Sequence, residues 1–269
     1  HGTSRGLGDV YKRQAASGMA SYQEAYSDQP SYTSGATADK ATGLMLALSV
    51  VSSLFKRNKD NKDLEVEVPM FETMVDFTLV EHLYGYNFLP PKDEPVYPRQ
   101  SSPNRKPYET KDGFIAVLPY NDEQWLRFLK FIKKEHLIKT KKFSTLENRN
   151  KNVDELYSLL VKELKKEKTN FWIKKLREID IPSMKINKPK DLFIDEHLKK
   201  TNFFKTYKHS TEGDLMYPRL PVYFNNERDN ESKFEAPNLG NKTKEILIDL
   251  GYDKNEIENL RKEKVIFFE

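Results

Sequence analysis

The residue with the clearest chemical potential is Asp39, which stands directly before the long apolar segment 40–57. Apolar residues lie on almost every side of the helix that this segment predicts, which is typical of a buried helix. An aspartate at a helix start has two common uses. It can cap the helix, which contributes about 1 kcal/mol, or it can serve as an ionised nucleophile stabilised by the helix dipole. From the residue alone, the cap is the better interpretation.

Other reactive or charged side chains are scattered along the chain. Tyr120, Asn121 and Asp122 form one loop that could face an acyl pocket, although a hairpin exit and a helix cap explain them equally well. Arg99 and Arg105 lie in a proline-rich segment, where they could contact an anionic substrate or a partner subunit.

No metal site is expected. The chain has no cysteine, which excludes disulfides, thiolate ligands and cysteine nucleophiles and suits a reducing cytoplasm. Trp125 and Trp172 fall on apolar helix faces and are expected in the core. The histidines of the chain body lack metal-ligand spacing, so surface or packing roles are expected for His82, His136, His197 and His209.

The composition predicts a globular protein with no membrane or nucleic-acid partner. Hydrophobic residues make up 37% and charged residues 32%, and no apolar run approaches the roughly 20 residues of a membrane span. The net charge of +4 is the small difference between 45 basic and 41 acidic residues. The lysine-rich runs Lys139–Lys142 and Lys165–Lys168 are therefore interpreted as solvated faces.

Hydrophobic periodicity predicts a mixed α/β protein. Strands are expected at 64–68, in a hairpin at 108–118 around Asp112-Gly113, at 184–186 and, interrupted, at 213–224. Helices are expected at 40–57, 70–84, from 121, at 153–167, at 169–179 with Thr169 as cap, from 189, at 241–250 with Gly251 after it, and at 253–261.

The domain organisation follows from breaks in these patterns. Residues 1–14 lack helical or strand periodicity and match no secretory signal, so we interpret them as a foreign leader. Residues 15–89 are expected to belong to a large α/β domain, and prolines make 90–107 an extended linker. A small α+β domain is predicted at 108–195, followed at 196–269 by a return linker and the C-terminal part of the large domain.

Six segments occur in an order that resembles the class III CoA-transferases (CaiB/BaiF type, formyl-CoA transferase-like). They are AASGMAS, SGATADKATGL, EVEVPMFETMVDF, RKPYETKDGFIAVLPYNDEQW, IPSMKIN and APNLGNKTKEILIDLGYDKNEIENL. Together they extend from residue 15 to about residue 262. The segment TADKATG is similar to the nucleophile motif of the family, and Asp39 falls on its aspartate. The surroundings therefore favour the nucleophile over the cap.

The resemblance implies a fold and a chemistry. The fold would be a Rossmann-like large domain, lacking its N-terminal part, plus a small domain, in an interlocked homodimer. CoA would move from an acyl-CoA donor to a carboxylic acid acceptor through aspartyl-anhydride and aspartyl-CoA thioester intermediates. Coenzyme A would be a substrate rather than a permanently bound cofactor. The family's N-terminal region supplies much of the CoA pocket, so the residues of that pocket are not predicted.

Two departures from the family and two alternatives remain. The family's Gly-Glu-His-Thr is replaced by Gly240-Asn241-Lys242-Thr243, and a glycine-rich loop of some formyl-CoA transferases is missing from 99–113.

One alternative is an acyl-CoA racemase of the same superfamily, in which an aspartate and a histidine exchange the α-proton. The other is an inactive lysine-rich fragment that acts only as a binding module.

Overall fold

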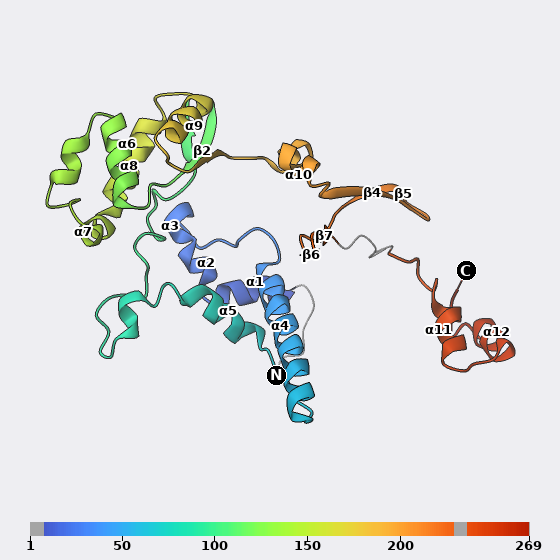
Figure 1. Cartoon of the computed structure of the whole chain (residues 1–269). Coiled ribbons are helices and arrows are strands. Elements are labelled where there is room, and N and C mark those ends of the chain that lie inside the picture. Colours follow the sequence, from blue (N-terminus) through green and yellow to red (C-terminus); the bar gives the residue numbers. More distant parts are fainter. Residues whose placement is uncertain (1–7, 229–235, 269) are drawn as a thin grey trace. The chain divides into compact units, whose positions relative to one another are not determined.

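The computed structural model describes residues 8–228 and 236–268. The chain separates into two compact units, His1–Ile186 and Asn187–Glu269. Each unit combines helices with small antiparallel sheets (Figure 1). The predicted mixture of helices and strands is confirmed, although no two of the described strands pair in parallel.

The first unit begins with helices α1 (Gly8–Ala16), α2 (Met19–Tyr22), α3 (Glu24–Ser27), α4 (Thr37–Asp60) and α5 (Met70–Leu79). Helices α1, α4 and α5 contact one another (Figure 1). A small core holds them together, in which Met19, Ala38 and Met74 are buried. The prediction that residues 1–14 lack regular structure is wrong for 8–14, which belong to α1; residues 1–7 lie outside the described part.

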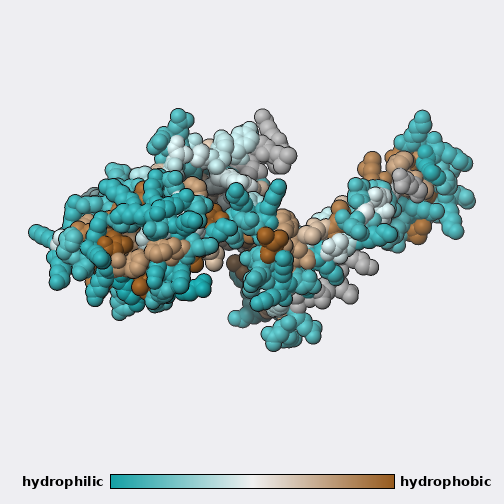
Figure 2. All heavy atoms as spheres, turned by 90° about the horizontal axis from the view of Figure 1, so that it is seen from above, coloured by the Kyte–Doolittle hydropathy of each residue, from teal (hydrophilic) through white to brown (hydrophobic). Residues whose placement is uncertain are grey.

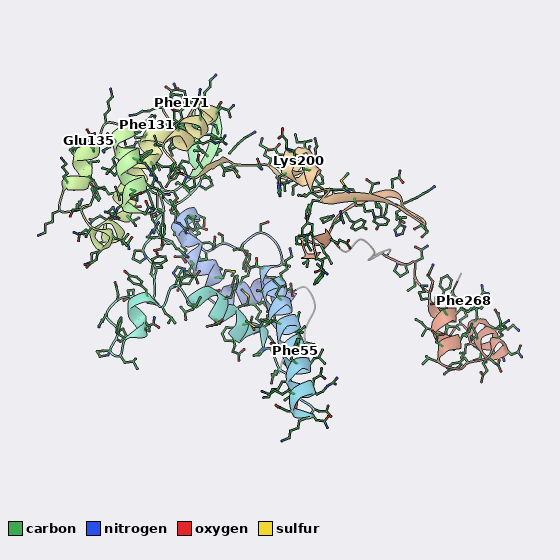
Figure 3. All side chains as sticks on the ribbon, in the orientation of Figure 1. Phe55, Phe131, Glu135, Phe171, Lys200 and Phe268 are labelled. Carbon is green, nitrogen blue, oxygen red and sulfur yellow. The ribbon has the colours of Figure 1, made fainter. Side chains whose placement is uncertain are left out.

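Helix α4 forms as predicted, but the prediction that it is buried is wrong. Phe55 and Leu44 are both 74% exposed, and Phe55 projects from the helix in Figure 3. Hydrophobic residues also interrupt the hydrophilic surface in the space-filling view (Figure 2). The helix was apolar enough to be buried, yet no described segment covers most of its surface. Burial depends on what packs against a helix as well as on its sequence.

The same helix corrects the expectation about apolar runs. An 18-residue window of α4 has a mean hydropathy of 1.3 and is 6% buried, so by length and composition alone the helix could cross a membrane. The expectation that no segment is apolar enough to span a membrane failed for this helix. The polar residues between its apolar ones lower the mean hydropathy only moderately. Core helices of soluble proteins also have this length and composition, so the absence of a membrane partner stays a prediction.

Residues 61–69 between α4 and α5 contain no strand, so the strand predicted at 64–68 is wrong. A strand is stabilised by hydrogen bonds to a neighbouring strand, and no described strand pairs with this segment. After α5 come a short 3-10 helix, η1 (Tyr84–Asn87), and a segment of bends and turns without helix or strand up to residue 107. That residues 90–107 link two domains stays a prediction.

Hydrogen bonds connect residues 95–100 of this segment to the N-terminal helices α2 and α3. The hydroxyl of Tyr22 in α2 donates a hydrogen bond to the carbonyl of Pro95 over 2.9 Å, and Tyr26 in α3 donates to the carbonyl of Gln100. On the other side, the backbone N–H of Tyr97 donates to Nδ1 of His82 over 3.1 Å. These bonds fix the path of the chain before it enters the next group of elements.

A three-stranded antiparallel sheet follows, in the order β1 (Tyr108–Thr110), β2 (Gly113–Val117) and β3 (Ser183–Lys185). The predicted hairpin is confirmed, with Thr110 opposite Gly113. The helices of this region are α6 (Asp122–Phe131), η2 (Glu135–Lys139), α7 (Leu146–Lys151), α8 (Val153–Leu164) and α9 (Thr169–Glu178).

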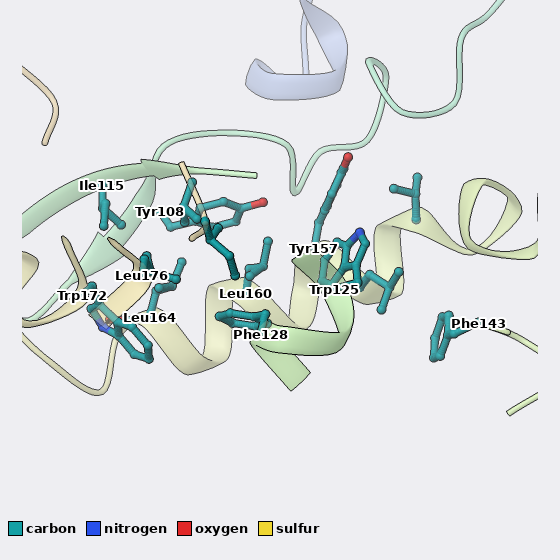
Figure 4. Close-up of a cluster of buried hydrophobic side chains, with 14 residues drawn as sticks. Tyr108, Ile115, Trp125, Phe128, Phe143, Tyr157, Leu160, Leu164, Trp172 and Leu176 are labelled. Carbon is teal, nitrogen blue, oxygen red and sulfur yellow. Dashed lines mark hydrogen bonds between the residues drawn. The ribbon is translucent and has the colours of Figure 1, made fainter. Parts of the chain in front are cut away.

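One hydrophobic core joins this sheet to its helices (Figure 4). Leu160, Leu164 and Leu176 are fully buried, and Trp125 and Trp172 are each 3% exposed. The prediction that both tryptophans are core residues is confirmed. The buried residues of the cluster all lie between residues 108 and 181, inside the segment predicted as a small α+β domain.

Two side chains cap the helices of this region. Asn121 accepts a hydrogen bond from the N–H of Gln124 over 2.9 Å, which confirms its predicted cap of α6. Thr169, in contrast, does not cap α9 as predicted, because it is the first residue of the helix. Asp112 of the hairpin takes that role, accepting from the N–H and the hydroxyl of Thr169 over 2.7 and 2.9 Å.

The second unit contains η3 (Pro189–Ile194), α10 (Glu196–Lys200), β4 (Phe204–His209), β5 (Gly213–Pro218), β6 (Tyr223–Phe224), β7 (Glu227–Arg228), α11 (Thr243–Asp249) and α12 (Lys254–Lys262). Strands pair as β4–β5 and β6–β7. The two last helices are confirmed, with Gly251 in the left-handed region after α11 and a capping box at Asp253. Strand β4 was not predicted.

Candidate active site

Asp39 is the third residue of α4, not its N-cap. The N-cap position is occupied by Ala36, which has no capping side chain, so the cap interpretation of Asp39 is wrong. The first turn has two faces: Ala38 is fully buried against Met19 and Met74, whereas Asp39 is exposed. The carboxylate of Asp39 therefore points away from the small core at the positive end of a helix.

Within the described part of the chain, the carboxylate of Asp39 has no hydrogen-bond or ion-pair partner. Both of its oxygens are free to react. The first backbone N–H groups of a helix also lack acceptors within the helix, so they can stabilise negative charge that develops nearby. The arrangement can support nucleophilic attack by a carboxylate on an acyl carbon.

The loop before α4 is held by a buried glutamine of α1. The Oε1 atom of Gln14, which is 2% exposed, accepts hydrogen bonds from the N–H of Thr33 over 2.9 Å and from its hydroxyl over 3.1 Å. The hydroxyl of Thr33 lies 3.1 Å from that of Thr37 in the first turn of α4. This chain of contacts positions the start of the helix, and hence Asp39. Sequence reasoning missed Gln14, because residues 1–14 were set aside.

Among the other candidates, Arg99 and Tyr120 lie together at one small pocket, which Arg149 also lines. Asp122 does not line this pocket but forms an ion pair with Arg149. Asn121 is the cap of α6 described above. Arg105 is half-buried and does not line this pocket.

The histidines have packing or surface positions. His82 is 7% exposed and stacks on Tyr22 with ring centroids 3.8 Å apart, and burial lowers the pKa of His82 despite the nearby charge of Glu81. His209 is also buried, whereas His136 and His197 are exposed. Over residues 8–228 and 236–268, no group of three or more possible ligands is arranged to hold a metal ion.

The family model for CoA-transferase family III matches residues 3–243. Among curated proteins, the chain is 29% identical to (R)-2-hydroxy-4-methylpentanoate CoA-transferase of Clostridioides difficile, covering 88% of this chain and 59% of that protein. It is 27% identical to cinnamoyl-CoA:phenyllactate CoA-transferase of Clostridium sporogenes, covering 85% and 56%. It is 26% identical to human succinyl-CoA:glutarate CoA-transferase, covering 84% and 51%.

Solved structures share the fold. A CAIB/BAIF family protein from Brucella suis is similar with a TM-score of 0.65 and 22% identity, over 90% of this chain and 62% of that chain. Rv3272 from Mycobacterium tuberculosis is similar with a TM-score of 0.64 and 18% identity, over 81% and 58%.

The chain belongs to CoA-transferase family III, since the family model matches most of its length. The predicted resemblance is thereby confirmed. The chain spans between half and three fifths of the length of these curated relatives.

Proposed function

We propose that the protein is a CoA-transferase that moves coenzyme A from an acyl-CoA donor to a carboxylic acid acceptor, with Asp39 as its nucleophile. The observation that carries this proposal is the family match over residues 3–243. The exposed, unpaired carboxylate of Asp39 at the first turn of α4 supports its role. The substrates are of the class named for the relatives, acyl-CoA thioesters and carboxylates.

The proposed reaction proceeds by alternating attack of carboxylate and thiolate. A carboxylate oxygen of Asp39 attacks the thioester carbon, the C–S bond breaks, and a mixed anhydride and CoA thiolate form. The thiolate then attacks the carbonyl carbon of the aspartyl group, releasing the donor acid and leaving an aspartyl-CoA thioester. The acceptor carboxylate attacks this thioester and expels the thiolate, which attacks the acceptor acyl carbon of the new anhydride. The products are the new acyl-CoA and free Asp39.

Trapping the acyl-enzyme tests this proposal. The chain is incubated with cinnamoyl-CoA or succinyl-CoA, the donors named for two relatives, and hydroxylamine is added before peptide mass mapping. The expected result is a hydroxamate on Asp39, which is lost in D39N. D60N is the matched control, because Asp60 is an exposed aspartate at the other end of the same helix.

Two other outcomes would contradict the proposal. Exchange of the α-proton of the acyl group without any adduct would favour the racemase. An adduct that survives in D39N would place the nucleophile elsewhere.

We also propose that the protein is cytoplasmic and forms a homodimer. The absence of cysteine and the wide exposed apolar surface of α4 support these two proposals. Light scattering on the purified chain measures its mass in solution, and a monomer at all concentrations would contradict the dimer.

A further inference from the structure

Gly43 lies in the second turn of α4 without a local structural reason for being a glycine. Its backbone φ is outside the left-handed region that favours glycine. Apart from its chain neighbours and the backbone of its own helix, no heavy atom of the described residues lies within 4 Å of the position that a Cβ would take. Glycine also destabilises a helix interior, because it loses more backbone entropy on folding than any other residue.

Other glycines of the chain are explained by their surroundings. A Cβ at Gly85 would collide with Asp93. Gly240 has a positive φ of 80°, and a Cβ there would collide with the carbonyl of Phe267. Neither reason applies to Gly43. Packing and backbone conformation within the described residues therefore do not account for its missing side chain.

The position of Gly43 relative to Asp39 supplies a reason. Residues four apart lie one above the other on the same face of a helix, and helical side chains point back toward the N-terminus. A side chain therefore covers the turn that precedes it. Any side chain at position 43 would lie over the turn that carries Asp39. Both residues are exposed, so the glycine leaves the surface beside the carboxylate uncovered.

The proposed reaction needs room at this place. A carboxylate oxygen attacks only when it comes within about 3–3.5 Å of the acyl carbon, in line with the bond that it will form. The acyl carbon carries the sulfur of coenzyme A on one side and the body of the acyl group on the other. Both parts of the thioester must therefore fit beside the first turn of α4.

We infer that Gly43 is a specificity-determining residue, because the acyl group of the thioester occupies the space beside Asp39 that a side chain at position 43 would fill. This inference rests on the proposed role of Asp39 as nucleophile. A larger residue at position 43 would hold the acyl carbon beyond the reach of the carboxylate. The size of residue 43 thus limits the bulk that an acyl-CoA can carry next to its reacting carbon.

The rate of adduct formation in variants of Gly43 tests the inference. The unmodified chain, G43A and G43L are mixed with cinnamoyl-CoA or succinyl-CoA and quenched with hydroxylamine after increasing times. Peptide mass mapping then measures the hydroxamate on Asp39. The rate should fall in the order unmodified chain, G43A, G43L, with G43L slower by about tenfold or more, since small misplacements of reacting atoms have large effects.

Stability should change in the opposite direction to the rate. Alanine and leucine are better helix formers than glycine, so neither variant should lower the urea midpoint of unfolding measured by circular dichroism. A slower reaction in these variants would therefore not result from loss of the helix.

S52L is the matched control, because it adds the same leucine side chain to an exposed residue of the same helix. Ser52 lies about 20 Å along the helix axis from Asp39, so its substitution should change the rate by less than about twofold. An adduct that forms as fast in G43L as in the unmodified chain would overturn this inference alone, and so would equal losses in G43L and S52L. No adduct in the unmodified chain would contradict the proposed function, and this inference with it.

Discussion

Glu163 of α8 offers a sensitive test of how charge stabilises the core shared by the three-stranded sheet and its helices. Its side chain is 7% exposed and is bound by two lysines: Lys134 lies 2.9 Å and Lys166 2.7 Å from its oxygens. Burial alone would raise the pKa of Glu163, but hydrogen bonds and charges from Lys166 and Lys134 outweigh burial and lower it. The ionised form of Glu163 thus stabilises the folded state.

The substitution E163Q keeps the size of the side chain and removes its charge. Hydrogen bonds to charged groups contribute about 1.5–3 kcal/mol each when they are well shielded. Here Lys134 and Lys166 are 38% and 62% exposed, so solvent screens both pairs. We therefore expect the free energy of unfolding to fall by about 1–2 kcal/mol at neutral pH.

The pH dependence separates charge from packing. Because the folded pKa of Glu163 is lowered, its contribution is complete above the ordinary glutamate pKa of about 4.3 and is lost as the pH falls through the folded value. The difference between the unmodified chain and E163Q should therefore vanish in acid.

Urea unfolding followed by tryptophan fluorescence measures this effect. Trp125 and Trp172 are the two tryptophans of the chain and both lie in the same core as α8. E178Q is the control, because Glu178 pairs with Lys175 at the surface, where an ion pair contributes little. An equal loss of stability at neutral and acidic pH would refute a charge-based contribution, and so would no loss at neutral pH.

Three further predictions follow from the described contacts. L160A should lower the free energy of unfolding by about 2–5 kcal/mol, and L146A, at a 52% exposed leucine, by less than about 0.5 kcal/mol, both measured by urea unfolding. D112A should reduce the protection of the N–H of Thr169 from hydrogen exchange. In the unmodified chain this protection, taken relative to the intrinsic exchange rate at each pH, should fall in acid, because the hydrogen bonds from Thr169 lower the pKa of Asp112 and protonation weakens them. Q14A should cost about 1–3 kcal/mol and speed exchange in the loop before α4; unchanged exchange would show that α1 does not hold this loop.

Local patterns were sufficient where a structure depends on neighbouring residues. The hairpin of β1 and β2, the cap at Asn121 and the glycine after α11 were all predicted, because turn and capping preferences act within a few residues. The failures involve distant partners. The cap of α9 comes from Asp112, 57 residues earlier in the chain, and no local pattern indicates such a pairing.

The same division holds for the candidate site. By itself the sequence determined that Asp39 lies near the start of a long apolar helix and within a family motif, since residue order carries both signals. Only the tertiary structure decided that Asp39 is an exposed residue of the first turn without a partner, held by Gln14 through Thr33. It also decided that Arg99 and Arg149 share a pocket. Exposure and pairing depend on which segments meet in space, and separation along the chain does not reveal that.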